Sequence, residues 1–163
     1  MMLSFAKLRA AISGLLYDKF PQIRDGDDGR IFFDNVERLE RPCFYVEIAP
    51  QRTRTFDAVI SERSLSVDVH YFGTEDADGN IDRTELYDMA DALDAAFRPV
   101  LYVADRAITI NDAEMQIVDE VLHYIFTLAF ADAFTEEEHP AKDADLMQIL
   151  TLNIDKEEKP NGK

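Results

Sequence analysis

Residues that would cross-link or anchor the chain are scarce in this sequence. It has one cysteine, Cys43, so no disulfide can form within the chain. No basic-then-apolar leader marks it for secretion, and the longest apolar run, Val121 to Ala131, is shorter than the roughly 20 residues that a membrane helix needs. We therefore expect a protein that folds in the cytoplasm and does not enter a membrane.

Positive charge is also scarce. The chain has 17 Lys and Arg residues against 33 Asp and Glu residues, which gives a net charge of −16. Proteins that grip nucleic acid gain most of their affinity from cationic contacts with phosphates, so this balance argues against DNA binding. An acidic surface that DNA slides past without sticking fits the charge, because like charges repel.

Catalytic motifs are missing as well. The sequence has no glycine-rich phosphate loop and no Gly-x-Ser-x-Gly elbow. His70, His123 and His139 are scattered with no cysteine near them to suggest zinc, and we interpret His70 and His123 as residues on the polar sides of strands. Cys43 stands within a strand pattern and is expected to be a small buried residue, not a nucleophile. We predict no enzyme, no catalytic residue, no cofactor and no metal site.

One segment resembles a calcium-binding loop. Residues Thr74–Glu85 match most defined positions of the twelve-residue EF-hand loop, with Gly79 at the sharp turn and oxygen ligands at Asp76, Asp78 and Glu85. However, Thr74 stands where the loop needs an acidic first ligand, and a strand precedes it instead of a helix. A strand-to-helix connection also uses Asp and Gly for its turn and an acidic helix cap. A small calcium-binding module is therefore an alternative and not our main prediction.

The residues that are plentiful predict one globular domain. Hydrophobic residues make up 47% of the chain and charged residues 31%, which is typical of a globular protein with a real core. We expect a single domain over residues 1–155 and a loose polar tail over residues 156–163.

Two segments predict central strands of a sheet. In Arg41–Pro50, one face carries Phe44, Val46 and Ile48 and the other carries Cys43, Tyr45 and Glu47. In Leu65–Phe72, one face carries Leu65, Val67, Val69 and Tyr71 and the other carries Ser66, Asp68 and His70. This alternation with a period of two is the pattern of strands that are covered on one side.

The N-terminal part predicts a helix followed by a short strand. Ser4 is a candidate N-cap, and apolar residues recur at helical spacing until Phe20-Pro21 ends the pattern. After a turn at Asp25–Gly29, Ile31–Phe33 predicts a short strand that pairs with Gln22–Arg24.

A basic arm is predicted after the first central strand. Gln51–Thr55 leads into Phe56–Ile60, which we interpret as a hairpin-like arm with a basic tip. In so acidic a chain, Arg52 and Arg54 are our candidate residues for an interface with another subunit or with a tube. The alternative is that both are ordinary solvated loop arginines, because exposed ion pairs contribute little.

The remaining segments complete an α+β fold. A second helix has an apolar stripe and ends before Pro99, and Asp82 with Glu85 resembles a capping box. Its stripe consists of Leu86, Met89, Ala90, Leu93 and Phe97. Val100–Ile110 predicts one or two strands, and a further strand has alternating apolar residues at Leu122, Tyr124, Phe126, Leu128 and Phe130. We predict a mixed, mainly antiparallel sheet of about four to five strands packed against two main helices.

These fragments together resemble the phage tail terminator family of prophages from Gram-positive bacteria. The resemblance runs from about Leu3 to about Phe134. It rests on the first helix ending in Phe20-Pro21, the Asp-rich second helix, and the strand segments Arg41–Val46, Val69–Phe72 and Val121–Phe126. The chain departs from the family pattern in the acidic stretch Asp25–Leu39.

The resemblance implies a structural role in virion assembly, with the protein at the head-proximal end of the tail and assembled in the bacterial host cytoplasm. Subunits of this family form a ring, typically a hexamer, that caps the tail tube, stops its growth and forms the interface for head-tail joining. The implied partners are other copies of the chain, the tail tube protein and the head-tail connector protein, while DNA passes through without specific binding. Another head-tail connector or completion protein is the alternative within the same biology.

Overall fold

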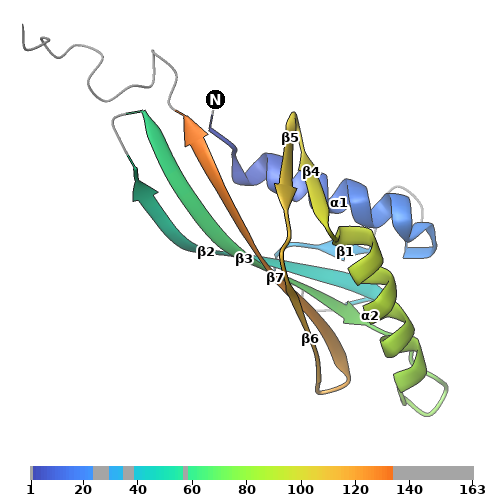
Figure 1. Ribbon diagram of the computed structural model, residues 1–163. Coiled ribbons are helices and arrows are strands. Elements are labelled where there is room, and N and C mark those ends of the chain that lie inside the picture. Colours follow the sequence, from blue (N-terminus) through green and yellow to red (C-terminus); the bar gives the residue numbers. More distant parts are fainter. Residues whose placement is uncertain (1, 24–29, 35–38, 57–58, 134–163) are drawn as a thin grey trace, which may run out of the picture.

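The computed structural model of the protein describes residues 2–23, 30–34, 39–56 and 59–133 (Figure 1). The elements in chain order are α1 (Phe5–Lys19), the 3-10 helix η1 (Pro21–Ile23), β1 (Ile31–Phe32), β2 (Cys43–Thr55), β3 (Ile60–Phe72), α2 (Arg83–Phe97), β4 (Val100–Val103), β5 (Arg106–Thr109), β6 (Ala113–Val118) and β7 (Val121–Ala133). The predicted turn at Asp25–Gly29 and the predicted tail 156–163 lie outside the described residues.

Five strands form the main sheet, in the order β1-β2-β3-β7-β6, and β4 and β5 form a separate two-stranded sheet. β2, β3 and β7 each have 13 residues. The pairs β2–β3, β3–β7 and β7–β6 are antiparallel, whereas β1 is parallel to β2. The prediction of a mixed, mainly antiparallel sheet with two main helices is confirmed. Among the described residues, no helix is long and apolar enough to span a membrane.

The core lies between one face of the main sheet, which we call the inner face, and a layer made of α1, α2 and the small sheet. The inner face supplies Phe44, Val46, Leu65, Val67, Val69, Tyr71, Leu122, Tyr124, Phe126 and Leu128, all buried. The predicted stripe of α2 is buried in full, from Leu86 to Phe97. The faces that period-two and helical spacing predicted are therefore confirmed. We call the opposite side of the sheet the outer face.

The helix caps agree with the sequence in part. The Ser4 side chain accepts a hydrogen bond from Lys7 N at 3.3 Å, and the Asp82 side chain accepts one from Thr84 N at 2.9 Å. The predicted capping box is wrong in its second half. Glu85 accepts hydrogen bonds from Tyr71 Oη at 2.6 Å and from Thr74 N at 3.1 Å, so it ties the start of α2 to the end of β3.

The pairing of the short N-terminal strand is also corrected. Ile31 and Phe32 of β1 lie opposite Phe44 and Tyr45 of β2, and they do not pair with Gln22 and Ile23 as we predicted; Arg24 lies outside the described residues. Residues 21–23 form η1 instead, where Pro21 fixes a helical φ angle at the first position. The edge of β2 gives β1 a longer partner than a three-residue helical turn can offer.

Candidate interface on the outer face of the sheet

The predicted arm is the end of the sheet where β2 turns into β3. It comprises residues 50–55 of β2 and 60–64 of β3, and residues 129–133 of β7 continue alongside β3. We call this three-stranded end the arm. The residues of β2 in the arm are exposed throughout, whereas Ser61 of β3 is buried. The arm is thus the antiparallel end of β2 and β3, in keeping with the predicted hairpin-like arm, and β7 extends the sheet beside it.

A β-bulge of one residue in β2 determines which face of the sheet carries Arg52 and Arg54. Pro50 lies opposite Leu65 and Arg52 lies opposite Ser64, so Gln51 has no partner on β3 and forms a β-bulge. Without the bulge, strict alternation from Phe44 and Val46 would place both Arg52 and Arg54 on the inner face. With it, they stand on the outer face together with Ser64 and Glu62.

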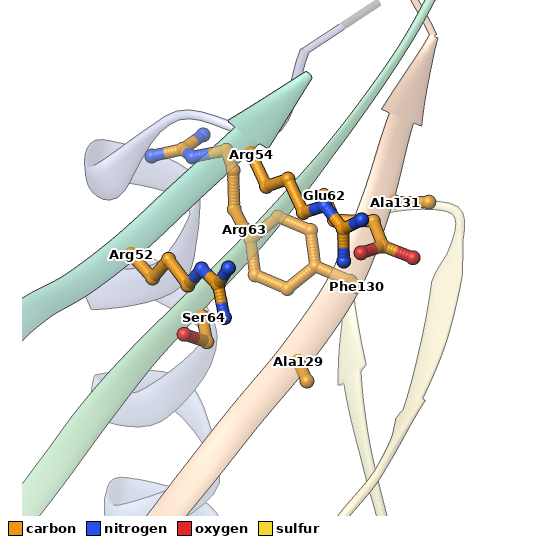
Figure 2. Close-up of a pocket in the computed structure, with 8 residues that line it drawn as sticks. All are labelled: Arg52, Arg54, Glu62, Arg63, Ser64, Ala129, Phe130 and Ala131. Carbon is orange, nitrogen blue, oxygen red and sulfur yellow. The ribbon is translucent and has the colours of Figure 1, made fainter. Parts of the chain in front are cut away.

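Figure 2 shows the two arginines beside a shallow groove that crosses the arm. The groove has a volume of about 460 Å³, and small side chains of Ser64, Ala129 and Ala131 line it. Within the described part of the chain, neither Arg52 nor Arg54 forms an ion pair, although Glu62 lies opposite Arg54 in the strand register. The groove therefore combines Arg52, Arg54 and the carboxylate of Glu62 with a floor of small side chains.

A buried carboxylate braces the arm from the inner face. Asp132 of β7 is 1% exposed and accepts hydrogen bonds from Leu3 N at 3.1 Å, from Arg63 at 3.4 Å and from Arg106. Arg63 also donates to Leu3 O at 2.6 Å and lies over the ring of Phe5. These contacts join the N-terminus, β3, β5 and β7 at Asp132. They hold the inner face of the arm against the layer that covers the sheet.

The middle of the outer face brings together three residues that the sequence keeps apart. Asp68 Oδ2 lies 3.1 Å from His70 Nε2 and 3.0 Å from His123 Nδ1, and the two imidazole centroids are 4.2 Å apart. Burial acts to raise the pKa of Asp68, but the two neighbouring imidazoles outweigh it and hold that pKa below its usual value. Sequence reasoning placed both histidines on polar faces but missed this cluster, because only the strand register shows that His70 and His123 face each other.

The loop that resembles a calcium site uses its carboxylates internally. Asp76 accepts hydrogen bonds from Asn80 N at 2.8 Å and Asp78 N at 2.9 Å, and these bonds, led by the one from Asn80, lower the pKa of Asp76. Glu85 is held by Tyr71 and by the Thr74 backbone, as described above. In the part of the chain that the structure describes, side chains gather as a possible metal-ligand group at Asp68, His70 and His123, and the loop forms no such group.

Cys43 is fully buried at the start of β2. Burial raises the pKa of its thiol to about 11, against the smaller opposing effects of Arg41 and Arg30. The side chain is therefore a protonated thiol at neutral pH, as expected for a residue that packs and does not react.

Comparison with known proteins identifies the family. The family model described as "Phage tail terminator protein" matches residues 7–140, which is most of the chain. The chain belongs to the phage tail terminator family. Membership makes it a structural component of phage tails with a role in tail completion, in agreement with the resemblance seen in the sequence. The match includes every helix and strand described above except the first two residues of α1.

Other comparisons add little to this assignment. No curated protein matches the chain in sequence. Several solved structures match, and one of them has 17% identity and a TM-score of 0.43, covering 82% of this chain and 98% of its own. At that level of similarity the match carries no functional argument. The family therefore rests on the family model.

Proposed function

We propose that this tail terminator closes into a ring of six copies on the head-proximal end of the tail tube, where it stops tube growth and joins the tail to the head. The observation that carries the proposal is the pair of exposed arginines, Arg52 and Arg54, on a rigid arm of a chain with a net charge of −16. Family membership gives the tail-completion role, and the arm supplies a means of subunit contact.

A ring built head-to-tail needs two different, complementary patches on each subunit. The arm provides the positive patch. For the negative patch we propose Asp88 and Asp91, which are exposed on α2. In Figure 1 the arm and α2 lie at different ends of the molecule, so they can serve as the two separate patches of a head-to-tail contact. Complementary charge of this kind increases association rates and selects the correct partner.

The remaining partners follow from the same assembly. One rim of the ring would contact the tail tube protein and the other the head-tail connector protein, after assembly in the host cytoplasm. DNA would pass through the central channel. Subunits as acidic as these repel the phosphate backbone, so the channel wall would not retain the DNA.

The test is a charge reversal at the arm. Arg52→Glu together with Arg54→Glu should leave the subunit folded but impair assembly, giving overlong or headless tails in electron micrographs of particles from cells that carry the variant. The matched control is Lys19→Glu together with Arg83→Glu, which changes the net charge equally at exposed positions outside the arm and should give normal particles.

A second variant tests the partner patch. Asp88→Arg with Asp91→Arg should restore normal tails when combined with the arm reversal, because the two charge patterns are then exchanged. Normal particles from the arm reversal alone would remove Arg52 and Arg54 from the interface. Normal tails after deletion of the whole gene would refute the terminator function itself.

A further inference from the structure

The outer face holds a side-chain cluster that tail assembly does not explain. His70 of β3 and His123 of β7 are directly opposite each other in the register, and Asp68 lies two residues before His70 on the same face. The side chains of these residues are 22% exposed for Asp68, 15% for His70 and 19% for His123. Two adjacent central strands thus present two imidazoles and one carboxylate in a partly enclosed position.

The hydrogen bonds in this cluster are incomplete. Asp68 Oδ1 is buried and has no hydrogen-bond partner, and the approach of His70 Nε2 to Asp68 Oδ2 lacks the geometry of a hydrogen bond. Among the described residues, Ser61 Oγ is the one other buried side-chain atom in this condition. Unpaired buried polar atoms are rare because they lose water without gaining a partner. Two such atoms at one cluster are therefore available to bind a ligand that reaches them from solvent.

The donor atoms have a spacing that suits a metal ion. In a tetrahedral zinc site, bonds of about 2.0–2.1 Å hold the ligand atoms roughly 3.3 Å apart. The carboxylate oxygen is 3.1 Å and 3.0 Å from the two imidazole nitrogens, and ligand atoms of all three residues lie within 4.8 Å of one another. Displacements of a few tenths of an ångström would open the cluster around an ion.

The chemistry of the donors selects the class of ion. Imidazole nitrogens favour zinc and similar transition metals, whereas calcium and magnesium favour sites made of oxygen alone. We propose that Asp68, His70 and His123 bind a divalent transition-metal ion, zinc above all, with one coordination position open to solvent. This inference is independent of the ring, because all three ligands come from one subunit.

The neighbouring residues support such a site. The ring of Tyr45 on β2 packs edge-on against His70, with centroids 5.2 Å apart, and restricts the orientation of that imidazole. Glu47 lies opposite Asp68 on β2, and Glu114 lies opposite Ile125 on β6, so both add negative charge to this side of the sheet. A bound ion would join β3 to β7 by direct bonds.

Metal titration of the purified, chelator-treated full chain tests the proposal. Zinc should raise the melting temperature by several degrees at a stoichiometry of one ion per chain, whereas calcium should not. Cobalt should give the visible absorption bands of a four-coordinate ion, and zinc should displace it. No thermal shift with zinc at millimolar concentration would overturn the proposal.

Variants identify the ligands. His70→Gln and His123→Gln should each weaken zinc binding at least tenfold, and Asp68→Asn should do the same. His139→Gln is the matched control, since it removes the only other histidine in the chain, and it should bind zinc like the wild type. Unchanged binding by the His70 and His123 variants would place any metal elsewhere and overturn the assignment.

A measurement without substitutions guards against variants that fail to fold. In the wild-type protein, paramagnetic cobalt should shift or broaden the imidazole proton resonances of two histidines and leave those of the third sharp. Equal effects on all three, or on none, would refute the site. Tail assembly is not measured in any of these experiments, so failure of the metal site and failure of the terminator function are distinguishable.

Discussion

Removing the carboxylate of Asp132 should destabilise the protein more than any exposed charge change. Asp132→Asn leaves the guanidinium groups of Arg63 and Arg106 without their anion, and their side chains are only 13% and 26% exposed. Breaking a buried ion pair costs roughly 3–5 kcal/mol. Because water reaches Arg106, we expect the lower end, about 3 kcal/mol, which corresponds to a fall of about 6–12 °C in melting temperature for a chain of this size.

The assay is thermal and urea unfolding of the purified subunit, with Asp91→Asn as the control. Asp91 is exposed on α2 and forms no ion pair with the other described residues, so its replacement should change the free energy of unfolding by no more than about 0.5 kcal/mol. A double-mutant cycle with Arg63→Gln should show strong non-additivity, because each variant removes the same contact. Equal, small effects of Asp132→Asn and Asp91→Asn would refute the reasoning.

Two further predictions concern the core. Val69→Asp or Phe126→Asp should prevent folding, because an unpaired buried carboxylate costs several kcal/mol against a total stability of about 5–15 kcal/mol. The measurement is thermal melting followed by circular dichroism. Melting that resembles the wild type would contradict the assignment of strand faces. Cys43 should react with iodoacetamide far more slowly at pH 8 in the native protein than in urea, because burial raises the pKa of its thiol to about 11 and excludes the reagent. Mass spectrometry measures the two rates. Equal rates would show that Cys43 at the start of β2 is accessible to solvent.

The central part of the fold could be predicted from the sequence because each strand there has one apolar and one polar face. The alternation around Val67 and Phe126, and the helical stripe that ends at Phe97, correspond to buried surfaces in the structure. Such patterns are local, and burial on one side enforces them. The first and last residues of these elements were less certain, as β2 continues to Thr55.

Features that depend on one residue or on distant pairing could not be predicted. The bulge at Gln51 reverses the faces of Arg52 and Arg54. Its local signal is Pro50, which has no N–H to donate, but a proline there equally fits the strand end that we predicted. β6 was missed because it is short and largely exposed, and because Asp119 and Glu120 make a turn with positive φ angles without the usual glycine. Asp68 and His123 are 55 positions apart and meet only through the register of β3 and β7.

In the proposed ring, the length of the arm bears on how many subunits fit together. From Val69 in the core to Glu62 beside Arg54 is a span of about 24 Å along β3, at about 3.4 Å per residue. Neighbouring subunits in a five-fold and a six-fold ring differ in relative rotation by about 12°, which over that length displaces the arginines by about 5 Å. That displacement exceeds the range of an ion pair. The contacts of Asp132 with Leu3, Arg63 and Arg106 oppose bending of the arm, so in the proposed ring the arm would favour one number of subunits over the next.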